Sequence, residues 1–305
     1  MANVNPAPIP ERYIVPIDVN KYDLNEEETA FFKQQTGITD DEKLKQHIIT
    51  AQAEAFAVYP YPCIRRFAFA KLKIAKLPAY PALLKLGKER EGAIFLDIGC
   101  CFGNDVRKAV ADGYPVQNAV ASDLQPGFWE LGHKLFNSTP ESFPVPFIAG
   151  DAFNPAHLEI VPPFTLKAPP TTPRPDLKTL TSLNPLRGHV AAIHASSFFH
   201  LFDEEQQFKL AQATAGLLSP EPGSMIFGMH GSRPTKGFRI SSGSGHTMFC
   251  HGPDSWRELW DGEIFEKGTV RVETKLVEVP DEADFKETIV PDGKRYWLGW
   301  SVTRL

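Results

Sequence analysis

The sequence predicts an α/β protein with a doubly wound, mostly parallel sheet of about seven strands and a helical N-terminal extension. Two observations indicate this class. From residue 93 onward, short apolar segments of strand length alternate with helical segments, which is typical of a parallel sheet with helices packed on it. Residues 1–90, by contrast, carry helical patterns and no strand signal.

The N-terminal extension, residues 1–90, begins with a proline-rich stretch and continues as helices. Residues 26–38 start with three acidic side chains, where the helix dipole favours negative charge, and have a glycine near their end. Apolar residues on one face predict further helices. These helices cover residues 40–60, residues 62–76 and the short segment YPALLKLGK.

The sheet domain is expected over residues 91–305. Its first five strands are AIFLDIG, NAVASDL, VPFIAGDAF, HVAAIHASS and GSMIFGMHG. The helices of this part are NDVRKAVADG, PGFWELGHKLF and DEEQQFKLAQATAGLL. After the helix DSWRELWDG, the segment TVRVETKLVEV alternates as a half-exposed strand does, and KRYWLGWSVTRL ends the chain as the last strand. Two insertions are expected, a proline-rich one near residues 161–188 and a polar, glycine-rich one near residues 231–253.

Composition excludes several classes of function. The net charge is −5 and no strongly basic block occurs, so nucleic-acid binding is not expected. No apolar run approaches the ~18 residues of a membrane span, and the first residues lack the layout of a signal peptide, so we expect a cytoplasmic protein without membrane contact. The four cysteines form no C-x-x-C pair, which favours small buried hydrophobes over a zinc site.

The segment IFLDIGCCFGNDVR, residues 94–107, places a glycine loop directly after the first strand. In doubly wound sheets, ligands bind at the carboxyl ends of the strands, beside the first one. The spacing is Gly99-x-x-x-Gly103, and Asn104 stands where a dinucleotide fingerprint has its last glycine. This weakens a nicotinamide interpretation, and no phosphate-binding G-x-x-x-x-G-K-[ST] motif is present.

Acidic residues at three strand ends fit a different cofactor. Asp97 ends the first strand and can attract an ammonium group. Asp123 ends the second strand and can accept two hydrogen bonds from a ribose diol. Asp151 follows the third strand and can accept from an adenine amino group, and Phe153 can pack on the base. S-Adenosylmethionine is a nucleoside that carries an amino acid and no phosphate, so it would use all four residues.

The sequence resembles class I S-adenosylmethionine-dependent methyltransferases. DIGCCFG is similar to their acid-x-Gly-x-Gly-x-Gly loop, with Cys101 in place of the middle glycine. More narrowly, the chain resembles fungal secondary-metabolite methyltransferases of meroterpenoid and polyketide pathways. The blocks that carry this resemblance are YPYPCIRRFAF, DIGCCFGNDVRK, HASSFFHLFDEEQQ and GSMIFGMHGS. The resemblance implies a Rossmann-like fold, cofactor contacts around 123–124 and 151–153, and N-terminal helices that fold over the site as a cap.

The expected cofactor site follows from the motif and the resemblance together. Cys100 and Cys101 are expected to present backbone to the methionine part of the cofactor and not to react. The full set of expected cofactor-binding residues is Asp97, Gly99, Cys100, Cys101, Gly103, Asp123, Leu124, Asp151, Ala152, Phe153 and Ser196. The serines after the fourth strand favour a reaction without a metal ion.

The acceptor is expected at HASSFFHLF, after the fourth strand. The absence of a [DN]-P-P-[FYW] motif there disfavours methylation of amide or base nitrogens. His200 and His230 are candidate bases for a hydroxyl acceptor. A carboxylate acceptor needs no base, and the serine hydroxyls of this segment could orient it. The expected substrate-pocket residues are Phe198, Phe199, His246 and Trp256.

The sequence therefore predicts an O-methyltransferase that acts on a carboxyl or hydroxyl group of a small, fairly apolar organic acceptor. The acceptor oxygen, the methyl carbon and the sulfur must lie in line for direct transfer. Two alternatives remain open at this point. One is a non-catalytic binding protein with the same fold, and the other is an NAD-dependent dehydrogenase.

Overall fold

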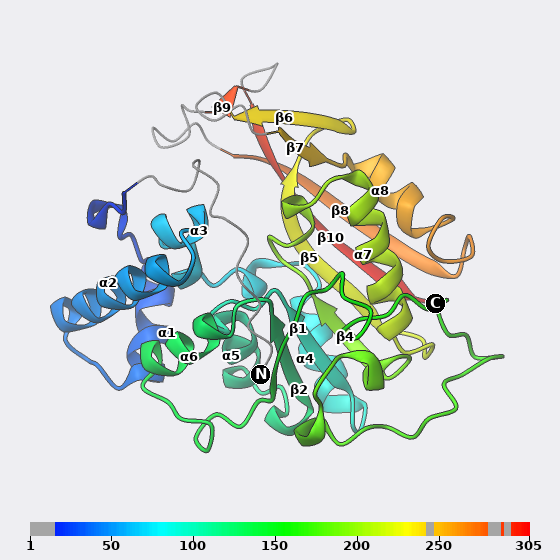
Figure 1. Cartoon of the computed structure of the whole chain (residues 1–305), viewed down its shortest axis with the longest axis horizontal. Helices are drawn as coiled ribbons and strands as arrows, with labels where there is room; N and C mark the ends of the chain where they lie inside the picture. The colour runs from blue at the N-terminus through cyan, green and yellow to red at the C-terminus, as the bar shows by residue number, and fades with distance from the viewer. Residues whose placement is uncertain (1–15, 242–246, 280–287, 290–293) are drawn as a thin grey trace.

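The computed structural model describes residues 16–241, 247–279, 288–289 and 294–305 and has an α/β architecture (Figure 1). Its central seven-stranded sheet has the order β3-β2-β1-β4-β5-β10-β8, in which the first five are parallel neighbours and β10 is antiparallel to both β5 and β8. The strands are β1 (Ile94–Ile98), β2 (Ala119–Asp123), β3 (Phe147–Ala149), β4 (Val190–His194), β5 (Met225–Ser232), β8 (Val270–Val279) and β10 (Arg295–Arg304). The predicted fold class is confirmed.

Helices cover both faces of this sheet. On β1, Ile94 and Leu96 belong to a core cluster with Leu210 of α7 and Trp260 of α8, whereas Phe95 points to the opposite face, where α4 and α5 pack. The helices of the domain are α4 (Tyr80–Glu89), α5 (Asn104–Ala111), α6 (Pro126–Leu135), α7 (Glu204–Leu217) and α8 (Pro253–Trp260). No helix in the described part of the chain combines the length and the apolar character that crossing a bilayer requires.

The N-terminal region, residues 16–90, is helical as predicted. A short 3-10 helix, η2 (Val19–Lys21), precedes α1 (Glu26–Thr36) and α2 (Asp41–Val58). α1 starts with a capping box between Asn25 and Glu28, and it ends at Gly37, whose φ of 73° places it in the left-handed conformation typical of helix ends.

The helix predicted over residues 62–76 is wrong. The segment instead forms α3 (Pro62–Arg65) and two 3-10 turns, η3 (Ala68–Ala70) and η4 (Ile74–Lys76), and Phe67 breaks the chain direction with a φ of 54°. The reason is burial. Residues two apart point to different sides of a helix, but Phe67 and Phe69 both enter the same apolar cluster, which an interrupted backbone allows.

The N-terminal region packs on α6 and on the glycine loop. α2 lies along α6, and His47 Nε2 lies 2.9 Å from the carbonyl oxygen of Leu135. The ring of Phe69 stacks on that of Phe102, in the loop after β1, with centroids 4.6 Å apart. In Figure 1 the N-terminal helices lie beside α5 and α6, at one side of the sheet domain.

The two predicted insertions differ in structure. Residues 161–188 contain only two 3-10 turns, η6 (Leu177–Thr179) and η7 (Asn184–Leu186), apart from an isolated bridge. Residues 231–253 are not a plain loop, because β6 (Gly237–Ser241) pairs with β7 (Thr247–Cys250) and with β9 (Thr288–Ile289) in a separate three-stranded sheet. These strands are only five and four residues long, and the polar, glycine-rich composition of the segment did not indicate them.

Candidate active site

The glycine loop between β1 and α5 turns sharply at three positions. Gly99, Cys101 and Gly103 have φ angles of 72°, 52° and 73°. A side chain at Gly99 would put its Cβ 2.8 Å from the ring of Phe198, and at Gly103 its Cβ would lie 2.5 Å from the ring of Trp129. Both glycines are therefore required by close packing as well as by backbone conformation.

Cys101 has the left-handed backbone conformation that favours glycine. A left-handed conformation costs a non-glycine residue about 1 kcal/mol or more. The backbone N–H of Cys101 donates to Asp123 Oδ2 at 2.9 Å, which helps to hold this conformation. Burial raises the pKa of the Cys100 and Cys101 thiols well above the usual value, so neither is a thiolate nucleophile at neutral pH.

Asp123 stands beside this loop at the end of β2. Its Oδ1 accepts from the N–H of Gln125 at 3.0 Å, in addition to the bond from Cys101 to Oδ2. Each carboxylate oxygen keeps a second lone pair, so the side chain can still accept from a diol. Burial raises the pKa of Asp123, although the backbone N–H donors oppose this shift.

The residues after β3 lie next to a surface hollow of about 520 Å³. Asp151 is exposed, and its Oδ1 accepts from the N–H of Phe153 at 2.9 Å. Leu124, at the end of β2, is also exposed. The hollow is lined by Ala152, Phe153, Pro155, Leu158, Glu159, Ile160, Gln206 and Lys209.

Asp97 lies at the end of β1 and faces β4. Its Oδ1 lies 2.8 Å from His194 Nδ1, and His194 Nε2 lies 2.7 Å from Ser196 Oγ. Asp97 Oδ2 is buried and has no hydrogen-bond partner among the described residues. A buried carboxylate oxygen without a donor is chemically suited to an ammonium group, and the contact of Asp97 with S-adenosylmethionine stays a prediction.

His194 itself is buried, but it is more than a core histidine with one satisfied bond, because it joins Asp97 to Ser196. Burial lowers the pKa of His194, but the charge and the hydrogen bond of Asp97 outweigh this and raise it above the usual value. The signal in the sequence was the spacing H-x-S at the end of a predicted strand, which places both side chains on one side.

His200 is the expected site histidine that follows β4, and it is partly buried. His200 Nδ1 accepts from the N–H of Gly231 at 3.0 Å, and burial lowers the pKa of His200 to about 3, with Arg239 and Lys73 adding to the shift. His246 lies outside the described residues.

The catalytic role predicted for His230 is not supported. The side chain is only 1% exposed, and its Nδ1 accepts from Trp300 Nε1 at 3.0 Å. Burial lowers the pKa of His230 well below the usual value. Its ring packs against those of Phe199 and Trp256, which are fully buried. These three residues belong to the core between the sheet and α8, not to a pocket wall.

Phe198 is the expected pocket aromatic that does border the loop. It is partly exposed and lies over Gly99. Its ring contacts that of Phe202 edge to face at 5.4 Å, and Phe202 contacts Phe153 at 4.8 Å. An aromatic row thus runs from the glycine loop to the residues after β3.

Lys73 is a candidate site residue that the sequence did not indicate. Burial makes the largest single contribution to the pKa shifts of Asp105, His194 and His200, and the positive charge of the Lys73 ammonium adds a smaller contribution to each. The backbone N–H of Ile74 donates to Asp105 Oδ1 at 3.0 Å, which fixes this segment against α5. The sequence FAFAKLKIAK does not indicate a site role for Lys73, because the position of this residue depends on the interruption of the predicted helix.

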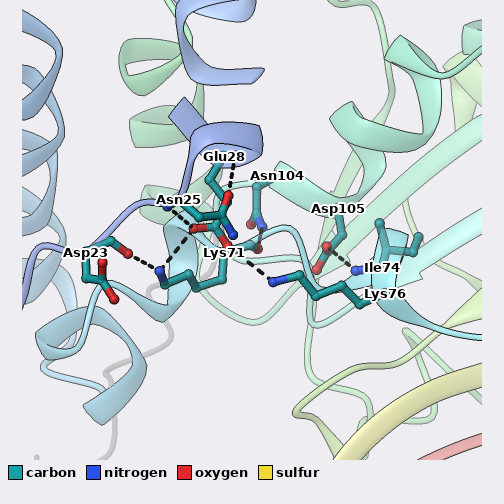
Figure 2. A network of polar contacts seen from close by, with 8 residues as sticks. All are labelled: Asp23, Asn25, Glu28, Lys71, Ile74, Lys76, Asn104 and Asp105. Atoms are coloured by element: carbon teal, nitrogen blue, oxygen red, sulfur yellow. Dashed lines mark hydrogen bonds and ion pairs between the residues drawn. The ribbon is translucent and has the colours of Figure 1, made fainter. Parts of the chain in front are cut away.

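A polar network around Glu28 ties the N-terminal region to the start of α5 (Figure 2). Glu28 is fully buried, and its carboxylate lies 3.0 Å from Lys71 Nζ and 3.6 Å from Lys76 Nζ. Asn104, the first residue of α5, donates its side-chain N–H to the Lys71 carbonyl at 3.1 Å. Helix α1 is thereby connected to the helix that follows the glycine loop.

Glu28→Gln is expected to lower the free energy of unfolding by about 1–2 kcal/mol, because the amide keeps the volume but loses two ion pairs. Both lysines are partly exposed and can be hydrated, which limits the loss. Urea unfolding measures this change. The matched control is Glu27→Gln, an exposed residue of the same helical turn. Equal stability of the two variants would contradict the role given to the buried carboxylate.

Comparison with known proteins supports one family. Residues 18–70 match the meroterpenoid methyltransferase N-terminal domain. The chain is 32% identical over 255 residues to the asnovolin E/chermesin D methyltransferase nvfJ of Aspergillus novofumigatus, and the match covers 84% of this chain and 82% of that protein. This chain belongs to the fungal meroterpenoid methyltransferases. The expected S-adenosylmethionine-dependent methyltransferase is thereby confirmed.

Two named O-methyltransferases are also similar over most of the chain. O-Methyltransferase phiE of a fungal species is 31% identical over 249 residues, with 81% of this chain and 73% of phiE covered. O-Methyltransferase atr3 of Stereocaulon alpinum is 32% identical over 266 residues, with 87% and 68% covered. Among solved structures, the 1,6-didemethyltoxoflavin-N1-methyltransferase of Burkholderia thailandensis is 12% identical with a TM-score of 0.47, covering 85% of this chain and 90% of that one.

Proposed function

We propose that this methyltransferase forms a methyl ester on the carboxylate of a small, apolar organic acid. The observation that carries the choice of acceptor is the hydrogen bond of His200, the histidine expected as a base. Its Nδ1 accepts the N–H of Gly231 at 3.0 Å, so the neutral ring carries its hydrogen on Nε2 and has no free lone pair to take the proton of an alcohol or phenol. The lowered pKa of His200 agrees with a weak base. A carboxylate is already ionised at neutral pH and needs no such proton transfer.

The cofactor is proposed to lie across the carboxyl ends of β1, β2 and β3. Asp123 accepts from the ribose diol, and Asp97 Oδ2 accepts from the ammonium group. Gly99 and Gly103 let the backbone approach the methionine part. Asp151 and Phe153 hold the adenine. When bound, S-adenosylmethionine supplies a methyl group that its sulfonium has already activated, so the chain needs no nucleophile of its own.

The acceptor is proposed to lie between β4 and the N-terminal region, which then acts as a cap. Phe198 provides an apolar wall, and the ammonium of Lys73 attracts the carboxylate. The chain contributes by placing the acceptor oxygen in line with the methyl carbon, which can supply several kcal/mol of the rate enhancement. Exclusion of water by the cap strengthens these charge interactions.

Two experiments test this function. Calorimetric titration with S-adenosylhomocysteine and with NAD separates a methyltransferase from a dehydrogenase, and tight NAD binding would contradict the proposal. Incubation with S-adenosylmethionine and a panel of aromatic and aliphatic acids, followed by mass spectrometry, should show addition of one methylene unit. Hydrolysis of the product by mild base identifies a methyl ester. A base-stable methyl ether would show that a hydroxyl is the acceptor, and absence of any product would favour a non-catalytic binding protein.

At saturating acceptor, kcat is expected to stay nearly constant between about pH 5.5 and pH 8.5. The imidazole of His200 remains neutral across this range, because its pKa of about 3 lies far below it. His200→Asn should give a parallel profile, since the amide oxygen can still accept from Gly231. A steep rise of kcat with pH in the parent that disappears in His200→Asn would instead establish His200 as the base.

A further inference from the structure

We propose that Asp97, His194 and Ser196 form a positioning relay in which His194 makes the Ser196 hydroxyl a hydrogen-bond donor to the carboxylate of the acceptor. This inference rests on the proposed function, because it assigns the group that orients the carboxylate in the same site. In this proposal Ser196 contacts the acceptor, whereas the sequence analysis expected it to contact the cofactor. His194 and Asp97 act through Ser196.

The geometry of the relay is set by the sheet. Asp97 and His194 are register partners on the parallel neighbours β1 and β4. Their side chains meet at 2.8 Å, and His194 Nε2 continues to Ser196 Oγ at 2.7 Å. In the strand order, β1 and β4 flank the point where the chain reverses its direction of winding. Ser196 therefore lies at the crevice where such sheets bind their ligands.

When His194 is protonated, the contacts of Ser196 use both lone pairs of its hydroxyl, and the hydroxyl can then only donate a hydrogen bond. A hydroxyl has one hydrogen and two lone pairs. The N–H of Met229 donates to Ser196 Oγ at 3.2 Å and uses one lone pair. A protonated His194 donates from Nε2 and uses the second. The hydrogen of Ser196 must then point to another acceptor, and Ser196 is partly exposed at the end of β4.

A neutral His194 reverses this arrangement. Its Nδ1–H donates to Asp97, so Nε2 accepts the hydrogen of Ser196. The hydroxyl then offers a lone pair to the crevice, and a lone pair repels a carboxylate. Proton uptake by His194 thus converts Ser196 from a hydrogen-bond acceptor to a donor, and an anionic acceptor stabilises the donor form.

Charges from three parts of the chain act on His194. Burial lowers the pKa of His194, Asp97 of β1 and Asp105 of α5 raise it, and Lys73 of the N-terminal region lowers it, with a net shift upward. The donor form is therefore present below this raised pKa and is lost as the pH rises through it. Above this pKa, binding of the acceptor carboxylate takes up to one proton from the solvent onto His194, and no other group needs to change its charge.

The test uses the full chain saturated with S-adenosylhomocysteine, titrated calorimetrically with 2-naphthoate as an apolar carboxylate. Titrations in buffers of different ionisation enthalpy measure the number of protons taken up. We expect net proton uptake at pH 8, and affinity that falls as the pH rises above the ordinary histidine range. 2-Naphthamide, the uncharged analogue, should bind without proton uptake. Equal affinity for the two probes, no proton uptake, or no binding of 2-naphthoate at millimolar concentration overturns the proposal.

Substitutions at two adjacent serines locate the effect. Ser196→Ala should weaken 2-naphthoate binding by about ten- to a hundredfold and abolish the proton uptake, and Ser196→Thr should restore most of both. Ser197→Ala is the matched control, because Ser197 follows directly and only its backbone N–H has a described hydrogen bond, to the Met229 carbonyl oxygen. An equal loss in Ser197→Ala overturns the assignment to Ser196.

The affinity for S-adenosylhomocysteine distinguishes a failure of this proposal from a failure of the proposed function. Ser196→Ala should bind S-adenosylhomocysteine within a few-fold of the parent, so a loss as large as that for 2-naphthoate would place the relay on the cofactor and overturn the inference. Failure of the parent to bind S-adenosylhomocysteine would instead contradict the proposed cofactor site. His194→Gln adds a further check where it folds, and the conclusions from Ser196 do not depend on it.

Discussion

Asp123→Ala is expected to weaken S-adenosylhomocysteine binding by about ten- to a hundredfold. The substitution removes the proposed acceptor for both ribose hydroxyls. It also removes the acceptors for the N–H groups of Cys101 and Gln125, which hold the glycine loop in its left-handed turn. Both effects act on the cofactor, and water recovers part of the loss. Calorimetric titration of the parent and the variant measures the ratio.

Asp176→Ala is the control for this variant. Asp176 also accepts a backbone N–H, that of Lys178 at 3.0 Å, but it lies in the 161–188 insertion. It should bind S-adenosylhomocysteine as the parent does. If Asp123→Ala kept the parent's affinity while thermal unfolding showed both variants folded, the ribose would be held by other residues.

The parts of the fold that the sequence predicted are those set by local pattern. The inner parallel strands β1 and β4 are buried on both faces and therefore read as short apolar runs, such as Ile94–Ile98, which is buried throughout. The break at Phe67 and the β6–β7 pair could not be read in the same way. Both depend on contacts with distant segments, namely Phe102 and β9.

The same distinction separates the predicted site residues from the missed ones. The loop glycines and Asp123 were expected from their spacing along one strand–helix–strand unit, β1-α5-β2, and the structure brings Asp123 to the glycine loop through its bond from Cys101. Whether an aromatic residue lines a pocket or fills the core depends on packing between elements, so Trp256 was wrongly placed in the pocket. Lys73 lies between η3 and η4 of the interrupted N-terminal segment, so the continuous helix predicted there gave no indication of its position.

Gly132→Ala is expected to lower the free energy of unfolding by about 3 kcal/mol, the largest stability effect among these predictions. Gly132 lies in α6, where a Cβ would stand 2.3 Å from the carbonyl oxygen of Phe102. That neighbour is backbone of the glycine loop, so no side-chain rotation can relieve the overlap. α6 must move away from the loop, which also disturbs the aromatic stack of Phe102 on Phe69. Urea unfolding of the cofactor-free protein measures the change.

Gly127→Ala is the matched control in the same helix. Its added Cβ would meet only side-chain atoms of Val58, at 3.2 Å and 3.3 Å, and these can shift. Alanine is also a better helix former than glycine by about 1 kcal/mol, which offsets the contact, so this variant should stay within about 1 kcal/mol of the parent. A Gly132→Ala protein as stable as Gly127→Ala would show that α6 does not press on the glycine loop. A destabilised Gly132→Ala protein that also binds S-adenosylhomocysteine more weakly would show that this contact supports the conformation of the cofactor loop.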